Sequence, residues 1–583
     1  MEITNRLAIQ IENELKNYFS APVQISPDNN FSASKLIRRI SLFENHIYPN
    51  GKFDSQMNYK FWYDEQKKCI DSNVKNIDID TKNFKIKSDR KIDELPLIIS
   101  NLKIKDYLRK SGQAEEINAS VEEFVGWGNL VFKKIKKGYE RGDLKNFYVI
   151  NQTAETLDES PVIERHQLGE SDLRAKKGVW EHISDVITSC KADYYAPTAE
   201  TQGKETTTPY YDIYERNGEV CLADLRAYQG KKASEKDKEQ YVLARVIGAG
   251  KKEVGVSNNV KIEYILFAEE IKKMPYEEAH YGIYKGRWFR EGIYEITFDD
   301  QVRLNQIGNQ LARGLEYAST LVLTDEDKLV IQSITTDIKS GDFIRSKGLH
   351  QVDLRMHAAD QLIADWNRTI QSMRDKANST EVVMGEALPS GTPLGAYNAL
   401  NMNANKLFGF LQEKLAIPFG KIFENWLIPE LVKDITSEEV LNLTGDADML
   451  DRVRLIIVDD WYLNNLIFLP PHDQMMADTL KAQKLEELKS RPQLLLTGLK
   501  ELFKDFAKNC YVDITGESST ELEDTQSLVS IIQMEADPVR RSYMVDILLK
   551  SRGFDVGKFP KAMPQVAPLA PQPTPTQPQL KTV

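Results

Sequence analysis

Apolar residues recur at spacings of three and four along Leu354–Asn378, and this period predicts a long helix. The period stops in Ser379–Gly395, where glycines and prolines gather, so we expect a loop there. It resumes in Ala396–Val432 and predicts a second helix of roughly 50 Å, kinked at Pro418 or ended early by Pro429. We expect this helix to be the spine around which the chain is organised.

The same period predicts two further helices, Ser171–Cys190 and Asp299–Leu323. Between them, Tyr194–Glu270 alternates apolar and polar residues, which is typical of strands, and Asn217-Gly218 is a hairpin signal. We therefore expect a small β-rich module inserted between helices. The second helix also carries small residues in pairs, which let helices approach closely although glycine weakens a helix; they are Gly308, Ala312, Gly314 and Ala318.

The last part of the chain changes character twice. Residues 472–556 keep a helical period throughout, which predicts an all-helical block. From Pro560 to Val583, proline, glutamine and threonine dominate and charge is almost absent, which is typical of a disordered or polyproline-like tail.

The composition fits a globular protein: of 583 residues, 41% are hydrophobic and 28% are charged. That length corresponds to roughly three or four domain-sized units. No run of eighteen apolar residues occurs, so we expect no membrane span, and the N-terminus has no signal-peptide pattern. The four cysteines are scattered, which indicates a reducing compartment and argues against a disulfide framework or a zinc site.

The net charge of −11 opposes tight binding of nucleic acid by one chain. It does not oppose a surface past which DNA slides without sticking. One basic run has two interpretations, a solvated face or a contact with a nucleic-acid backbone. Its members are Lys133, Lys134, Lys136, Lys137 and Arg141.

Enzyme signatures are absent from the sequence. The phosphate-binding loop, the HExxH zinc motif and the GxSxG nucleophile motif do not occur, and the seven histidines are isolated. We therefore expect no enzyme activity, no catalytic residue, no metal and no cofactor. A weak alternative is a metal-dependent nuclease site in the β-rich segment, built from Asp212, Glu219 and Lys231.

Four stretches carry a family resemblance through their order and spacing. They are SDLRAKKGVWEHISDVI, MPYEEAHYGIYKGRWFREGIYE, MGEALPSGTPLGAYNALNMNANKLF and YVDITGESSTELEDTQSLVSIIQ. They resemble the portal proteins of tailed bacteriophages, and within that family those of the crAss-like group, over about residues 50–556. The resemblance implies an α+β fold with long stem and spine helices, a β-rich clip insertion, a mixed α/β wing and an all-helical C-terminal crown.

The resemblance also implies a division of the chain. The parts are an N-terminal segment (1–49), the first part of the wing (50–170), stem helix 1 (171–193), the clip (194–298), stem helix 2 (299–323), the second part of the wing (324–378), the tunnel loop (379–395), the spine helix and wing end (396–471), the crown (472–556) and a disordered Pro-rich tail (557–583).

In that family, twelve subunits form a ring at one capsid vertex, through which double-stranded DNA enters and leaves. The implied partners are other copies of the chain, the major capsid protein, the terminase large subunit, head-tail adaptor and tail proteins, and DNA in transient, non-specific contact. The implied location is the virion, with the host cytoplasm during assembly and no membrane. The alternatives are another head-tail connector ring, or a metal-dependent nuclease or terminase component.

The residue pattern agrees with a ring. Twelve copies carry a net charge of roughly −130, which repels DNA over about 10 Å. The loop Ser379–Gly395 contains no Lys or Arg, so it either touches DNA without gripping it or simply connects two helices. The candidates for the DNA channel are Arg374, Lys376, Glu381, Glu386, Ser390 and Thr392, and those for packing between subunits are Gly308, Ala312, Gly314 and Ala318.

Overall fold

The computed structural model describes most of the chain up to residue 433. The described ranges are 6–319, 323–324, 350–351, 359–379, 383–384, 394–433 and 474–490, with a few short runs between 454 and 513 and Val545; the gaps before 319 are 21, 27–28, 56, 80–83, 89–93, 111, 137, 195–209 and 253–259. The chain divides into two compact units, Met1–Thr515 and Gly516–Val583. The elements below belong to the first unit, which is a mixed α+β structure.

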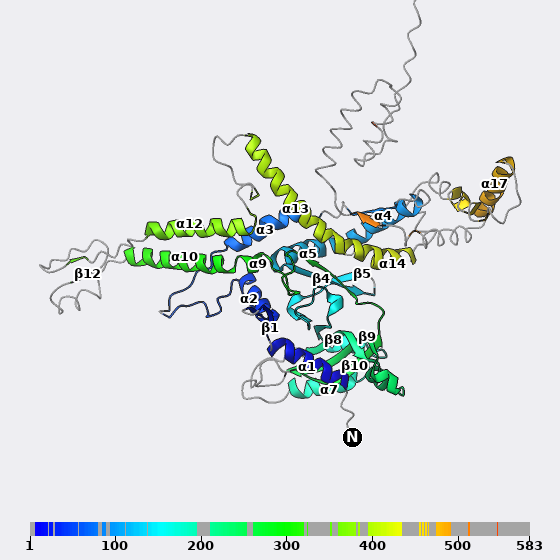
Figure 1. Cartoon of the computed structure of the whole chain (residues 1–583), viewed down its shortest axis with the longest axis horizontal. Helices are drawn as coiled ribbons and strands as arrows, with labels where there is room; N and C mark the ends of the chain where they lie inside the picture. Colours follow the sequence, from blue (N-terminus) through cyan, green and yellow to red (C-terminus); the bar gives the residue numbers. More distant parts are fainter. Residues whose placement is uncertain are drawn as a thin grey trace, which may run out of the picture. The chain divides into compact units, whose positions relative to one another are not determined.

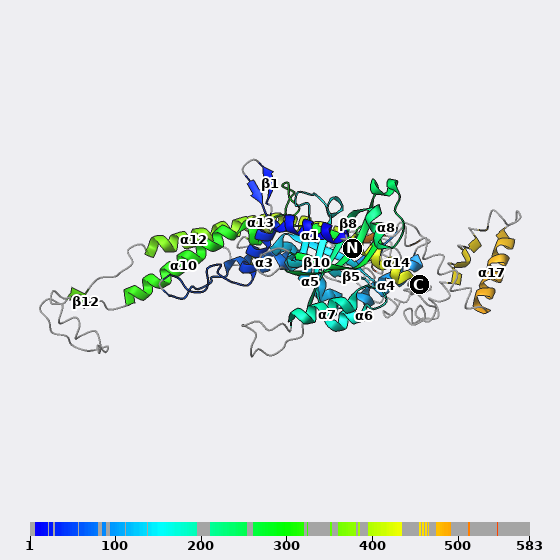
Figure 2. The same ribbon diagram turned by 90° about the horizontal axis from the view of Figure 1, so that it is seen from below.

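A five-stranded antiparallel sheet has the strand order β10–β9–β8–β7–β6. Successive side chains point to opposite faces, so each face can hold its own core. One face packs on α1 (Arg6–Ser20) and the other on α7 (Ile183–Tyr194), as Figure 2 shows. The strands are β6 (Phe147–Val149), β7 (Val162–Leu168), β8 (Tyr211–Cys221), β9 (Tyr241–Lys252) and β10 (Val260–Glu270).

The structure corrects three expectations in this region. Ser171–Cys190 is not one helix: α6 (Glu170–Ala175) ends early, and α7 starts only after a turn that contains Gly178 at φ 94°. Asn217-Gly218 is not a hairpin turn, because both residues lie inside β8 and pair with β9. The β-rich segment is not a separate insertion either, since its strands join β6 and β7, which precede residue 171.

A second antiparallel sheet has the order β11–β4–β5 and three strands. A large core cluster joins it to α3, α4, α5 and the long helix α13. The bounds are β4 (Asn129–Ile135), β5 (Gly138–Arg141), β11 (Tyr276–His280), α3 (Glu65–Ile77), α4 (Glu94–Lys110), α5 (Gln113–Trp127) and α13 (Leu394–Ile422).

The long helices lie where the periodicity predicts them. The helix expected over Asp299–Leu323 is α10 (Phe298–Ser319), and the described part of the one expected over Leu354–Asn378 is α12 (Ala359–Lys376). These two helices lie side by side (Figures 1 and 2). The expected spine helix is α13, which continues past Pro418 into a π turn and then α14 (Ile428–Lys433).

The remaining elements complete the described part of the chain. They are β1 (Val23–Ser26), β2 (Asn29–Phe31), α2 (Ala33–Glu44), β3 (Lys85–Lys87), α8 (Leu222–Tyr228), α9 (Ile293–Ile296), β12 (Leu323–Thr324), β13 (His350–Gln351), α17 (Gln474–Ser490), β14 (Tyr511–Asp513), and 3₁₀ turns at Leu144–Asn146, Leu157–Glu159 and Glu235–Lys238.

The C-terminal prediction holds only in part. Helix α17 lies in the predicted all-helical block, but β14 is a strand that pairs with β3 from the N-terminal part of the chain. The boundary between the two compact units also falls inside 472–556. The rest of the block and the tail after residue 556 lie outside the described residues. Within the described residues, no helix combines the length and apolar character needed to cross a membrane.

Candidate functional site

Three amide side chains on α10 hold the segment that precedes α3. Gln301, Asn305 and Asn309 are spaced four residues apart, so they lie on one face of the helix. Asn309 accepts from the backbone N–H of Phe61 (2.7 Å) and donates to the Phe61 carbonyl (2.9 Å). Asn305 accepts from the N–H of Tyr63 (2.9 Å), and Gln301 donates to its carbonyl (2.6 Å). This amide ladder satisfies an extended backbone much as a neighbouring strand does.

Gly308 lies on the same helix and faces into the chain. A Cβ atom at this position would lie 2.2 Å from the ring of Tyr63 and 2.7 Å from the ring of Trp366 on α12. The two rings meet edge to face, with 4.9 Å between their centroids. Gly308 therefore serves packing within one chain, which corrects its predicted role between subunits. Of the other predicted packing residues, Ala312 and Gly314 are half-buried. The side chain of Ala318 lies outside the described part of the structure.

The α10–α12 pair is antiparallel and is closed by ion pairs. Asp300, near the start of α10, accepts from Lys376 at the end of α12 (2.8 Å). Arg303 pairs with Asp365 (2.5 Å), and both side chains are substantially exposed. Exposed pairs contribute only about 0.5 kcal/mol each, so the Tyr63–Gly308–Trp366 packing carries more of the pairing.

The cations predicted to touch DNA have partners within the chain. Arg374 donates to Glu65 on α3 at 3.0 Å, and both side chains are largely buried, at 15% and 8% exposure. A buried guanidinium cannot neutralise a DNA phosphate without leaving its carboxylate unpaired, which is costly. Arg374 therefore does not suit the DNA contact that the sequence predicted for it. Lys376 is half-exposed and pairs with Asp300. The other candidates, Glu381, Glu386, Ser390 and Thr392, lie outside the described residues.

The start of the predicted tunnel loop is fastened to α3. The side-chain amide of Asn73 donates to the carbonyl of Ala377 (2.9 Å) and to the hydroxyl of Ser379 (2.8 Å). That hydroxyl donates in turn to the carbonyl of Cys69 (3.2 Å). Burial raises the pKa of the Cys69 thiol to about 11, so this cysteine is an inert packing residue at neutral pH.

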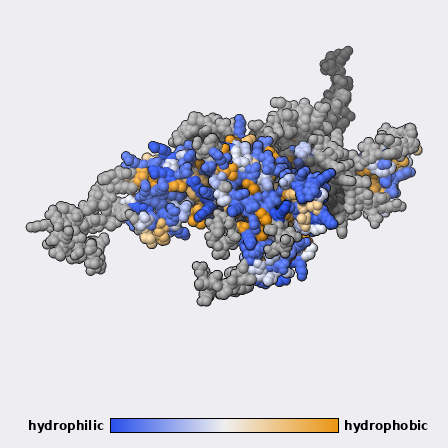
Figure 3. Space-filling model, turned by 60° about the horizontal axis from the view of Figure 1, so that its bottom comes forward, coloured by the Kyte–Doolittle hydropathy of each residue, from blue (hydrophilic) through white to orange (hydrophobic). Residues whose placement is uncertain are grey.

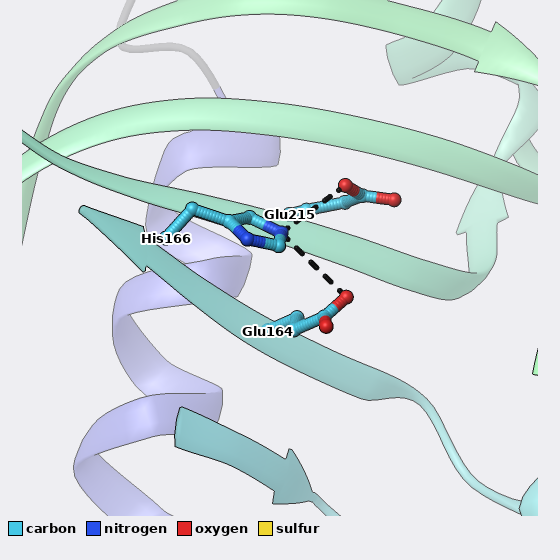
Figure 4. A group of neighbouring side chains, drawn as sticks. All are labelled: Glu164, His166 and Glu215. Carbon is cyan, nitrogen blue, oxygen red and sulfur yellow. Dashed lines mark ion pairs between the residues drawn. The ribbon is translucent and has the colours of Figure 1, made fainter. Parts of the chain in front are cut away.

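Four ionisable side chains meet where the two sheets face each other. Lys133 of β4 lies 2.5 Å from an oxygen of Glu164 on β7 and 2.9 Å from an oxygen of Glu215 on β8. His166 on β7 points between the two carboxylates, 3.6 Å and 3.4 Å from them (Figure 4). Lys133, Glu164 and Glu215 are all buried. We call these four residues the ion cluster.

The ion cluster keeps its charges although it is buried. Burial opposes the charge of Lys133, yet Glu215 and Glu164 raise its pKa above the ordinary value. Burial also opposes the charge of Glu215, but the hydrogen bond from His166 and the positive charges of Lys133 and Arg245 hold its pKa well below the ordinary value. Arg245 lies 2.9 Å from the second oxygen of Glu215. The cluster therefore joins the two sheets through balanced opposite charges.

The same residues are of the types that bind divalent cations. Ligand atoms of Glu164, His166 and Glu215 lie within 4.8 Å of one another, and carboxylates with imidazole suit zinc or manganese. The ammonium of Lys133, however, already lies between the two carboxylates. A metal ion would have to displace a buried, paired cation, so this donor set does not fit a resident metal.

The metal-site residues considered from the sequence do not converge. Asp212 pairs with Arg165 at 2.8 Å. The side chain of Glu219 is exposed, and Lys231 donates to Gln229 (2.9 Å). The nuclease alternative therefore loses the residues on which it depended.

The basic run does not form one surface. Lys133 is buried in the ion cluster, whereas Lys134 and Lys136 are exposed. Arg141 pairs with Glu123 at 2.7 Å. Lys137 lies outside the described residues. Neither the solvated face nor the nucleic-acid contact therefore describes all members of the run.

The sequence offered one signal for the ion cluster, the alternation of Glu164 and His166 along a strand.

A polar cleft of about 440 Å³ lies between α2, α3, α5 and the turn after β5, and its lining includes Lys67, Arg141 and Lys145 as well as acidic residues. Its acidic residues are Glu44, Asp71, Glu122, Glu123 and Asp143. Burial outweighs the attraction of Arg141 and raises the pKa of Glu123 to about 7. This carboxyl group therefore changes its charge near neutral pH.

Comparison with known proteins gives little. No family model matches the sequence, and no curated protein matches it either. Among solved structures, the chain is similar to a chain in the neck of a native gene transfer agent particle, a phage-like particle, whose structure was computed with C12 symmetry. The two share 9% sequence identity at a TM-score of 0.32, over 76% of this chain and 99% of that one. A likeness this slight carries no argument about function.

Proposed function

We propose that this chain is a portal protein, copies of which close into a ring at the unique vertex of a tailed-phage capsid and conduct double-stranded DNA. The observation that carries the proposal is the antiparallel α10–α12 pair, which is fixed at one end to α3 and continues at the other into residues 320–358. This pair supports the proposal as a candidate for a stem, although the resemblance implied a stem made of residues 171–193 and 299–323; the fastened loop start and the long helix α13 follow it along the chain.

In this proposal α10 and α12 together are the stem, in place of the pairing of α10 with Ser171–Cys190. Residues 320–358 then replace 194–298 as the segment that meets the terminase large subunit and later the head-tail adaptors. The five-stranded sheet belongs to the wing, next to the major capsid protein. The chain acts as a structural conduit in the virion, without catalysis.

The outer faces of the stem suit passage of DNA. Several of their exposed residues are amides, which offer hydrogen bonds but no charge; they are Gln306, Gln310, Gln361, Asn367 and Gln371. Tight, salt-dependent DNA binding requires several cations that release phosphate counterions. On the described faces, Arg303 and Lys376 are each paired with an aspartate, and Arg368 is exposed without an ion pair. A duplex can therefore slide along these faces without being held.

The proposal is tested by imaging purified full-length protein by negative-stain electron microscopy, with a Mg²⁺-dependent DNA cleavage assay in parallel. We expect rings with a central hole and no cleavage. Discrete single chains that cut DNA would overturn the proposal.

The tunnel loop offers a second test. Replacing residues 381–392 with a shorter Gly-Ser segment leaves the Asn73–Ser379 anchor in place. We expect ring assembly to be unchanged and DNA packaging to fall about tenfold or more, because the loop acts on DNA and not on folding. Loss of assembly in this variant would show that the loop is structural.

A further inference from the structure

The exposed side of α13 carries lysines at regular intervals. Lys406, Lys414 and Lys421 lie about two helical turns apart, so they line one side of the helix over about 22 Å. Lys406 and Lys421 are exposed, and the half-buried Lys414 holds its ammonium group 5.1 Å from the centre of the exposed Phe410 ring. Glu413 is the one acidic residue of α13. This side of the helix is therefore positively charged.

The positive charge continues onto the three-stranded sheet against which α13 packs. Phe132 of β4 contacts Phe419 of α13, with 4.8 Å between the ring centroids. Lys134 lies two residues further along β4, so it projects from the same face of the sheet, and it is exposed. An exposed lysine of β4 therefore borders α13.

Two lysine ammonium groups converge on Glu277 of β11. Glu277 is paired with Phe132 across the two strands, so its carboxylate lies on the α13 face as well. Lys273, just before β11, lies 3.2 Å from one oxygen of Glu277, and Lys421 lies 3.8 Å from the other. The carboxylate is largely buried, whereas both lysines are substantially exposed. We call five residues the lysine row: Lys134, Lys273, Lys406, Lys414 and Lys421.

The lysine row has more positive charge than the chain around it neutralises. Lys134 and Lys406 take part in no ion pair within the part of the chain that the structure describes. Lys414 donates to the backbone carbonyl of Tyr281 (3.1 Å), and burial together with the positive charge of Arg290 lowers its pKa. The charge that acts on Lys414 is thus another cation, and a bound anion would offset this repulsion.

The chemistry of the row suits a phosphate backbone. Duplex DNA carries one negative charge per about 1.7 Å of its axis, so the cations of a row about 22 Å long meet phosphates in any register. Lysine is a compact point charge that binds phosphate without reading bases. Interfaces between proteins are instead depleted in lysine, which makes a second copy of this chain the poorer occupant.

Apolar contacts are a weaker basis for recognition than charge in this molecule. On the face drawn in Figure 3, the described surface is mostly hydrophilic and its apolar patches are small. A partner that meets such a surface is recognised through charge and hydrogen bonds.

We propose that the lysine row binds the phosphate backbone of double-stranded DNA, weakly and without regard to sequence. This inference deepens the proposed function and rests on it, because the DNA is the genome that the ring conducts. The row is short, and Lys273 and Lys421 share the charge of Glu277. Each copy therefore holds the duplex loosely, which agrees with its passage.

The test measures binding of a short fluorescent DNA duplex to full-length protein by anisotropy at several salt concentrations. The triple variant Lys134→Gln/Lys406→Gln/Lys421→Gln removes three cations of the row. Each phosphate contact contributes about 0.9 to the slope of log K against log salt, so we expect that slope to become smaller by about 2.7. At low salt the dissociation constant should rise about tenfold or more.

Two further variants keep the result independent of folding and of net charge. Lys16→Gln/Lys232→Gln/Lys236→Gln removes the same charge from exposed lysines of α1 and of the segment after α8, and it should bind DNA as the wild type does. Arginine at the same three positions of the row keeps the charge and should also match the wild type.

The outcomes separate this inference from the proposed function. Wild-type protein that stays as single chains overturns the proposed function, whether or not it binds DNA. Wild-type rings that bind no duplex at low salt, or that lose no affinity in the triple Gln variant, overturn the lysine row alone. An equal loss in the control triple variant would also overturn it, because net charge would then explain the binding. A row variant that binds DNA normally but forms no rings would assign the row to a second copy of the chain.

Discussion

The two sheets and the α10–α12 pair use opposite means to hold their parts together. The sheets bury charge: the ion cluster lies between them, and Arg216, 1% exposed, pairs with Glu14 of α1 at 2.7 Å. The helix pair relies on buried neutral groups, the amide ladder and the Gly308 contact, and its Arg303–Asp365 ion pair lies at the surface, whereas the largely buried Arg374–Glu65 pair joins α12 to α3. Buried charges are costly to separate, whereas surface pairs are cheap. The buried charges therefore hold the two sheets in one arrangement, whereas the α10–α12 pair relies on close packing.

The largest effect should come from the ion cluster. Lys133→Met leaves Glu164 and Glu215 buried without their shared cation, and we expect the free energy of unfolding to fall by about 4 kcal/mol. Urea denaturation followed by tryptophan fluorescence measures it. Lys134→Met, the exposed neighbour on the same strand, is the matched control. An equal, small loss in both variants would mean that the cluster does not hold the sheets.

The second effect concerns pH. The pKa of Glu123 is raised from its ordinary value of 4.5 to about 7 in the folded chain, so the folded state keeps a proton that the unfolded state releases. The resulting stability is present below pH 4.5 and is lost as pH rises through 7. Between pH 4.5 and 7, the free energy of unfolding of the wild type should fall by about 3 kcal/mol relative to that of Glu123→Gln. Denaturation at a series of pH values measures this difference. Glu122→Gln, in the same cleft but exposed, should follow the wild-type profile, and a flat difference for Glu123→Gln would refute the assignment.

The third effect tests the packing of α10 against α12. Gly308→Ala places a methyl group against the rings of Tyr63 and Trp366. We expect the free energy of unfolding to fall by about 2 kcal/mol, although alanine has a better helix propensity than glycine. Thermal unfolding reports it. Gly409→Ala is the control, since that position is open, and it should be neutral or stabilising. No difference between the two variants would mean that α10 and α12 are loosely packed.

The smallest effect should come from the exposed surface of the α10–α12 pair. Arg303→Ala removes the exposed pair with Asp365 and should lower the free energy of unfolding by about 0.5 kcal/mol or less. This difference from the wild type should become smaller in high salt, which screens exposed charges. The measurement is denaturation at low and high ionic strength. A loss as large as that of Lys133→Met would erase the contrast between the two regions.

Sequence periodicity found the long helices because α10, α12 and α13 each repeat apolar residues over several turns. It could not place Ser171–Cys190 in two helices, since the break lies at an exposed turn with Gly178 at φ 94°, after which the backbone N–H of Glu181 donates to the Leu266 carbonyl on β10 (2.8 Å). The ion cluster was hidden because its members come from three strands, and Lys133 looked like part of a solvated basic run. The amide ladder was hidden for a similar reason: Gln301, Asn305 and Asn309 look like an ordinary polar face until the chain at Phe61 lies against them.

The most direct test of the central claim is the mass of the purified full-length protein in solution, measured at several concentrations. The account predicts a closed assembly with one fixed number of subunits. Single chains at every concentration would contradict it.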